Sequence, residues 1–137
     1  MIQEKAEEIS VVQARWKARL KRLEDCFAQC SFLLSLGLSN SGNRELRRED
    51  YRIPGCQTAI WQKVNWENGR ISIRYDSDSV LVLGVLSIFQ ELYEEREIRE
   101  IRENPPEFLE EISEEVIYRE IRENGLRRYY ENLFRAS

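Results

Sequence analysis

The stretch "TAIWQKVNWENGRISIRY", residues 58–75, decides the fold because it reads as two strands joined by a tight turn. Asn68-Gly69 is a strong hairpin signal, since two-residue hairpin turns need positive φ. Apolar and polar residues alternate after the turn, which directs Ile71 and Ile73 toward the core. A two-stranded ribbon is marginal in isolation, so we expect helices to cover it, with room for a third short strand.

The residues that follow predict a buried central helix. Asp76, Ser77 and Asp78 are all able to cap a helix N-terminus. Val80–Tyr93 is apolar on nearly every side, as expected of a helix surrounded by other elements. Capping fully explains the two aspartates, so they give no support for paired-carboxylate hydrolysis.

The first long segment carries a helical stripe of apolar residues. Its members are three or four positions apart, which predicts one helix that buries a single face. Gly37 is expected to end this helix, and a polar loop then extends to about Tyr51. Cys30 lies on the stripe with Cys26 beside it, so both thiols are expected in the core. The stripe consists of Val12, Trp16, Leu20, Leu23, Phe27, Cys30 and Leu34.

The last third of the chain predicts short helices followed by a longer one. Arg96–Glu103 has opposite charges four residues apart, and Asn104-Pro105-Pro106 then breaks the helix. Phe108–Tyr118 reads as one or two short helices, and the last helix is expected from about Asn124. We therefore predict an α+β fold, a small antiparallel sheet of two to three strands packed by helices, in a single domain spanning residues 1–137.

Composition excludes several classes of function. The sequence has no histidine, which removes the commonest general base and metal ligand and every Cys-His or Ser-His pair. A net charge of −4 argues against nucleic acid as a main partner. No segment is long and apolar enough to cross a membrane, and residues 1–10 show no leader pattern. Three cysteines do not make a secreted disulfide framework, so we expect a reducing cytoplasm.

One cysteine stands apart from the packing pattern. Cys56 follows a Pro54-Gly55 turn at the entrance to an apolar run, where a thiol is accessible in principle. Nothing supplies the fourth ligand that a zinc site with Cys26 and Cys30 would need, so no metal is expected. The residues alone leave two interpretations open: a structural cysteine, or a reactive thiol whose ionisation a positive group has to favour.

Three blocks of sequence, in the same order, resemble the SufE family, the sulfur acceptors of cysteine desulfurases. "IPGCQTAIW" at 53–61 is similar to the motif that carries the family's cysteine. The segment 76–84 resembles the start of the family's central helix, and "RENGL" at 122–126 resembles its Arg-x-Asn-Gly-Leu motif. The similarity extends from about Leu23 to Arg135 and implies a SufE/IscU-like fold.

The resemblance implies that Cys56 accepts persulfide sulfur from a SufS-like cysteine desulfurase, stimulates that enzyme, and passes the sulfur to a SufBCD-like iron–sulfur scaffold. The chain would be a persulfide-carrying sulfurtransferase component without a cofactor, because pyridoxal phosphate belongs to the partner. In the family, the free protein holds the cysteine loop against an apolar cavity, and docking swings it outward.

Beside the resemblance, we hypothesise that residues around the cysteine act near its loop. Arg122 is expected to stabilise the thiolate or persulfide anion, with an ordinary surface ion pair as the alternative. Asp78 is expected to cap the central helix or to bond the loop backbone. The remaining loop and partner residues are Pro54, Gly55, Gln57 and Trp61.

Other functions stay open at this stage. An IscU-type scaffold would assemble clusters on several cysteines, but two of the three cysteines here are expected in the core. A non-catalytic docking regulator would stimulate a desulfurase without taking sulfur. An acceptor outside iron–sulfur assembly would use the same persulfide chemistry, and the motifs do not separate it from the leading interpretation.

Overall fold

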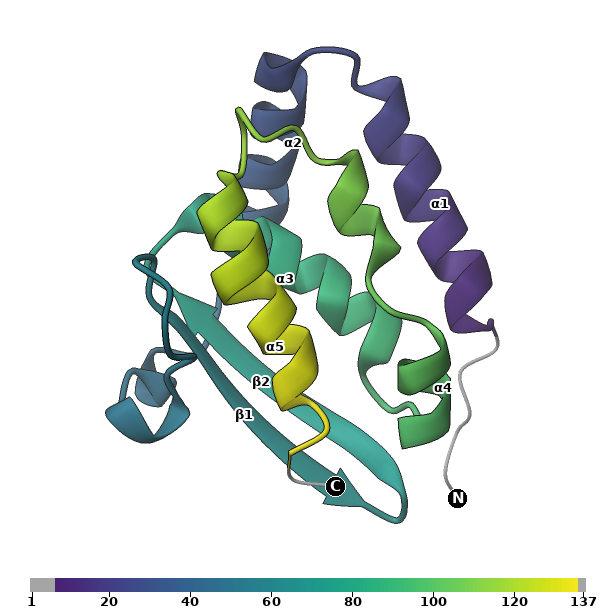
Figure 1. Cartoon of the computed structure of the whole chain (residues 1–137), viewed down its shortest axis with the longest axis vertical. Coiled ribbons are helices and arrows are strands. Elements are labelled where there is room, and N and C mark those ends of the chain that lie inside the picture. Colours follow the sequence, from purple (N-terminus) through teal and green to yellow (C-terminus); the bar gives the residue numbers. More distant parts are fainter. Residues whose placement is uncertain (1–6, 136–137) are drawn as a thin grey trace.

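The computed structural model describes residues 7–135 and has the predicted α+β architecture, a two-stranded antiparallel sheet packed by helices (Figure 1). The stretch 1–10, interpreted above as lacking a leader, falls partly outside these residues. In chain order the main elements are α1 (Ile9–Arg22), α2 (Cys26–Ser39), β1 (Ile60–Glu67), β2 (Arg70–Ser77), α3 (Val80–Tyr93), α4 (Ile98–Glu103), the 3₁₀ helix η3 (Glu107–Glu111), the π-helix η4 (Ile121–Leu126) and α5 (Arg127–Asn132).

The hairpin forms as predicted. β1 and β2 pair antiparallel from Ile60 opposite Ser77 to Glu67 opposite Arg70. Asn68 has φ 53° and Gly69 has φ 78°, so both turn residues adopt the left-handed conformation that this turn requires. Ile71 and Ile73 are buried, whereas a third strand is absent from the sheet formed by residues 7–135.

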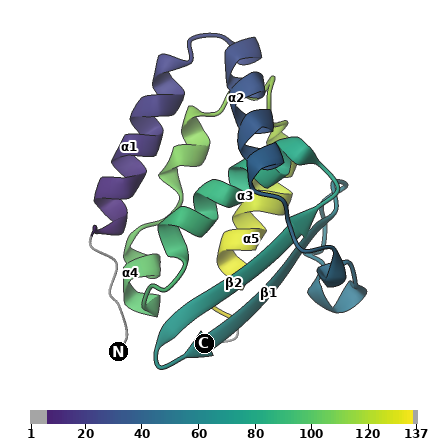
Figure 2. The ribbon, with the colours of Figure 1, turned by 180° about the vertical axis from the view of Figure 1, so that it is seen from behind.

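Helix α3 lies at the centre of the molecule, between the α1–α2 pair and the hairpin (Figures 1 and 2). Its N-cap is Ser79, whose hydroxyl accepts a hydrogen bond from the Val82 N–H at 3.2 Å. The expectation that Asp76–Asp78 supply the cap is therefore wrong by one residue. Gly84 lets α2 approach closely, because a Cβ at this position would stand 2.1 Å from the Leu33 carbonyl oxygen.

The predicted single N-terminal helix is wrong, because the chain breaks between α1 and α2. The Asp25 carboxylate accepts a hydrogen bond from the Ala28 N–H at 2.7 Å and starts α2 as a separate helix. The new helix buries a different face, so Phe27 of the predicted stripe is 80% exposed. Gly37 does not end the helix but lies buried within α2, where a Cβ would stand 2.0 Å from the Val80 carbonyl oxygen.

Two buried glutamines fasten the segment after α4 to the first two helices. Gln13 of α1 bonds the backbone at Pro105 and Phe108, with distances of 3.2 and 3.0 Å. Gln29 of α2 bonds the backbone at Glu111 and Ser113, at 2.7 and 2.9 Å. We call these two sets of contacts the glutamine clamps.

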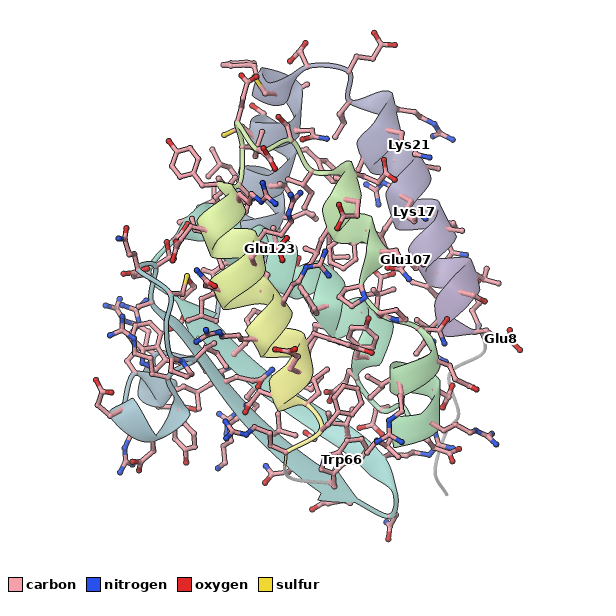
Figure 3. All side chains as sticks on the ribbon, viewed as in Figure 1. Glu8, Lys17, Lys21, Trp66, Glu107 and Glu123 are labelled. Atoms are coloured by element: carbon pink, nitrogen blue, oxygen red, sulfur yellow. The ribbon has the colours of Figure 1, made fainter. Side chains whose placement is uncertain are left out.

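Ion pairs support the same contact from outside. Lys17 on α1 faces Glu107 at 3.6 Å, and Lys21 lies 3.8 Å from Glu111 (Figure 3). Both pairs are more exposed than the glutamines, so they add little to the stability of the clamps.

The C-terminal helical segment lies across one face of the hairpin, as the two opposite views show (Figures 1 and 2). The Gln62 amide of β1 donates to the Tyr129 carbonyl oxygen at 2.9 Å and joins the two elements. Helical structure begins before the predicted Asn124, because the π-helix Ile121–Leu126 leads directly into α5. Among the described residues, no helix has both the length and the apolar character needed to cross a bilayer.

Candidate functional site

Residues 52–59, here called the Cys56 loop, lead into β1 and fold back on it. Arg52 forms an antiparallel bridge with Trp61, and the Ile53 N–H donates to the Ile60 carbonyl oxygen at 2.8 Å. Gly55 has φ 85°, a conformation that glycine adopts without strain. These constraints turn the Cys56 thiol inward: the residue is only 6% exposed, so the solvent-accessible thiol suggested by the Pro-Gly turn is not observed.

The thiol lies against Gly125 of the π-helix. A Cβ at Gly125 would stand 2.7 Å from the Cys56 Sγ and 3.1 Å from the Ile60 Cδ1, so only glycine leaves room for the sulfur. Sequence reasoning found the "RENGL" block but assigned a role only to its arginine. The glycine in a helical context was the available signal, since glycine within a helix often marks a close approach.

Burial is the main influence on the thiol's ionisation, and it raises the pKa of Cys56. The Thr58 backbone N–H lowers this pKa by hydrogen bonding to the sulfur. The negative charges of Glu120 and Asp78 raise it, and the positive charge of Arg52 lowers it. The loop in this position therefore disfavours the thiolate, which is the form in which a cysteine reacts.

The start of α3 and the polar loop before Cys56 frame the site. The Ser77 hydroxyl and the Asp78 N–H both donate to the Ala59 carbonyl oxygen, at 2.7 and 3.3 Å. Asp78 therefore bonds the loop backbone through its own backbone, while its side chain is exposed. The buried Asp76 carboxylate accepts from Arg47 Nε at 2.6 Å, and the same guanidinium covers the half-buried Trp61 ring, 5.0 Å from its centroid.

Arg122 points its guanidinium toward two glutamates. Its Nη2 lies 3.0 Å from Glu114 and its Nε lies 3.6 Å from Glu123, with the side chain 11% exposed. Glu123 stands on the helical segment before α5 (Figure 3). The charges that shift the pKa of Cys56 come from other residues, so the role expected for Arg122 stays a prediction.

A second arginine, which sequence reasoning missed, contacts the loop directly. The Arg128 Nη1 donates to the Pro54 carbonyl oxygen at 3.0 Å. Its guanidinium also fills the space over Gly55, where a Cβ would stand 2.1 Å from the same nitrogen. Pro54, Gly55 and Gln57 are exposed around the buried cysteine, so the loop presents its backbone and hides its thiol.

The other two cysteines lie apart from this arrangement. Cys26 and Cys30 are half-buried rather than in the core, because α2 is rotated relative to the predicted stripe. The Cys26 thiol donates to the Glu115 carboxylate at 3.5 Å, and this contact raises the pKa of Cys26. Within residues 7–135, no three cysteine, aspartate or glutamate side chains gather closely enough to hold a metal ion.

Comparison with known proteins places these features in a family. Residues 14–136 match the model of the SufE family, described as an Fe-S metabolism associated domain. The fold is also similar to the solution structure of a hypothetical protein from Thermus thermophilus. The TM-score is 0.63 over 91% of this chain and 89% of that one, at 17% sequence identity, so this likeness concerns the fold alone.

Proposed function

The chain belongs to the SufE family, whose domain is associated with iron–sulfur metabolism, and on this premise we propose that Cys56 is a persulfide carrier. In this proposal Cys56 accepts sulfur from a cysteine desulfurase, stimulates that enzyme by freeing it for another turnover, and hands the sulfur to an iron–sulfur scaffold. The observation that carries the proposal is a single thiol buried in a loop, against a glycine that leaves room for it.

The proposed transfer is a thiolate attack at sulfur. The Cys56 thiolate attacks the outer sulfur of the desulfurase persulfide, and a new S–S bond forms as the old one breaks. The electron pair of the broken bond leaves on the desulfurase cysteine, which becomes a thiolate, so the exchange needs no external oxidant or reductant. Pyridoxal phosphate acts earlier, in the partner, and this chain needs no cofactor of its own.

The resting position of Cys56 is unsuited to this attack, because burial disfavours the thiolate. We propose that docking of the desulfurase draws the Cys56 loop outward, where water and the partner's charges favour ionisation. A reducing compartment such as the cytoplasm suits this chemistry, since the thiol has to stay reduced between transfers.

Arg122 and Asp78 have secondary places in the proposal. Arg122 lies in the helical segment that contacts the thiol and would have to leave Glu114 and Glu123 to meet a persulfide anion. Asp78 supports the loop backbone near Ala59. Replacement of Arg122 by alanine should reduce transfer without unfolding the protein; unchanged transfer would remove Arg122 from the mechanism.

The experiment that tests the proposal is intact-mass analysis after incubation with a cysteine desulfurase and L-cysteine, without reductant. We expect a gain of one or more sulfur atoms that reductant reverses. A Cys56→Ser variant should gain none, whereas a Cys26→Ser/Cys30→Ser variant should gain as much as the parent. A Cys56→Ser variant that stimulates the desulfurase as well as the parent would instead indicate a docking regulator.

A further inference from the structure

The contact between Arg128 and the Cys56 loop has no place in the chemistry proposed above. Arg128 Nη1 donates to the Pro54 carbonyl oxygen at 3.0 Å, two residues before the cysteine. The guanidinium also lies directly over Gly55, the residue whose positive φ forms the turn. A charged donor on a neutral carbonyl makes a stronger hydrogen bond than a neutral pair does, and it joins the loop to a separate element.

The two sides of this contact differ in how firmly they are held. Arg128 stands on α5, whose next residue, Tyr129, is fully buried and accepts a hydrogen bond from Gln62 of β1 at 2.9 Å. On the loop side, hydrogen bonds hold the two ends at Ile53 and Ala59. Between these ends, among the residues that the structure describes, Arg128 is the only side chain of another element that hydrogen-bonds to residues 54–58. The helix is thus a fixed support and the loop is the part that can move.

The contact is also within reach of another molecule. A solvent-open pocket of about 380 Å³ lies beside it, lined by Ile53, Pro54, Arg128, Glu131, Asn132 and Arg135. The exposed Arg128 side chain borders this opening, whereas the Cys56 thiol is buried, so the guanidinium is the part of this site that another molecule can reach.

We propose that Arg128 is a positioning residue that holds the Cys56 loop closed over its thiol, and that opening of the loop requires the Arg128–Pro54 contact to break. The inference rests on the proposed function only in taking Cys56 as the thiol that transfers sulfur. Loss of the contact increases the open fraction of the free protein and so increases the apparent affinity of any partner that binds the open form.

The test is the rate at which iodoacetamide alkylates Cys56 under native conditions, in a Cys26→Ser/Cys30→Ser background that leaves one thiol. Iodoacetamide is uncharged, so removal of an arginine does not change its attraction to the protein. We expect Arg128→Ala to react about fivefold faster than the parent, the effect of losing one exposed hydrogen bond to a charged donor. Loss of a positive charge lowers the thiolate fraction, so the charge effect alone cannot produce this gain.

Two variants and one further measurement make the result decisive. Arg135→Ala removes the other arginine of the pocket and should react at the parent rate, while Arg128→Lys keeps a donor and should fall between the parent and Arg128→Ala. The free energy of unfolding of Arg128→Ala should fall by no more than about 1 kcal/mol, which is the fivefold change expressed as a free energy, because the closed loop loses the same contact. Equal rates for Arg128→Ala and Arg135→Ala, or an Arg128→Ala rate that rises with sub-denaturing urea as steeply as global unfolding does, would overturn the inference.

The alkylation assay uses no desulfurase, so it separates this inference from the proposed function. A chain that gains no sulfur in the mass experiment but is alkylated faster as Arg128→Ala would lose the sulfur-carrier proposal and keep the loop-closing contact. A chain that gains sulfur but shows no effect of Arg128 would do the reverse.

Discussion

At the scale of single residues, the position of Cys56 couples ionisation to folding. A buried thiol is neutral in the folded protein at a pH where the same thiol in the unfolded chain is already partly ionised. The loop position that buries the cysteine is therefore favoured by the protonated form of the thiol. This coupling makes the ionisation of one side chain measurable through the free energy of unfolding.

The pH dependence of unfolding should report this coupling. Below about pH 8.5, the ordinary pKa of a free thiol, Cys56 is protonated in both states, and the stabilisation from its raised pKa is complete. As the pH rises toward the folded-state pKa, the unfolded thiol ionises first and the free energy of unfolding falls. We expect the stability difference between the parent and Cys56→Ser to shrink above this pH, by on the order of 1 kcal/mol per pH unit.

Urea denaturation between about pH 7 and pH 9.5 measures this difference, below the ordinary tyrosine pKa of about 10. Cys26→Ser should be present in both proteins, because the pKa of Cys26 is raised as well. The buried tyrosines titrate later still, since burial raises the pKa of Tyr130 to about 12. A stability difference that is constant with pH would show that the thiol ionises equally in both states.

The sequence identified Cys56 but not what surrounds it. A cysteine after a Pro-Gly turn can be recognised from the sequence alone, and the family resemblance implied that this cysteine is turned toward the interior. Arg128 was missed because its contact with Pro54 joins residues 74 positions apart, and no periodic pattern connects them. The partners of Arg122 depend in the same way on where Glu114 comes to lie.

At the scale of elements, the hairpin and the central helix were predicted correctly because their signals are local. The Asn68-Gly69 turn and the apolar run of α3 need no distant partner to be recognised. The break between α1 and α2 was missed because apolar residues continue through it at helical spacing. The signal for the break was Asp25, a capping residue whose effect on helix start outweighs a continuous stripe.

The crossing of α2 and α3 depends on Gly84, which packs against the Leu33 carbonyl group. Gly84→Ala adds a methyl group 2.1 Å from that oxygen, so the two helices have to separate. Helix propensity alone predicts that this change raises the free energy of unfolding by about 1 kcal/mol. Overpacking predicts that it lowers the free energy of unfolding by about 2 kcal/mol. We expect the loss, measured as a lower free energy of unfolding in urea.

Ser31→Ala is the matched control, because Ser31 is exposed on α2 and its replacement tests propensity without crowding. The free energy of unfolding of this variant should equal that of the parent or be slightly higher. A Gly84→Ala protein more stable than the parent would mean that the helices accommodate the methyl group and that propensity dominates at this crossing.

At the scale of the whole molecule, the buried hydrogen bonds that stabilise the fold and the cysteine site lie in different parts of the protein. The glutamine clamps join α1 and α2 to residues 105–113, whereas the Cys56 loop lies at the opposite side of the molecule from α1 (Figure 1). Local opening of the loop breaks no clamp, so motion at the site need not weaken the rest of the fold.

Gln29→Ala should test this separation. The change leaves the Ser113 N–H and the Glu111 carbonyl oxygen without their amide partner, so we expect a loss of about 3 kcal/mol in the free energy of unfolding. The alkylation rate of Cys56 under native conditions should stay at the parent value, because the loop opens without global unfolding.

Gln57→Ala is the control, because it replaces an exposed glutamine beside the cysteine and should leave the free energy of unfolding unchanged. If Gln29→Ala instead accelerates alkylation in proportion to its lost stability, then Cys56 is reached only through global unfolding, and the loop does not move independently.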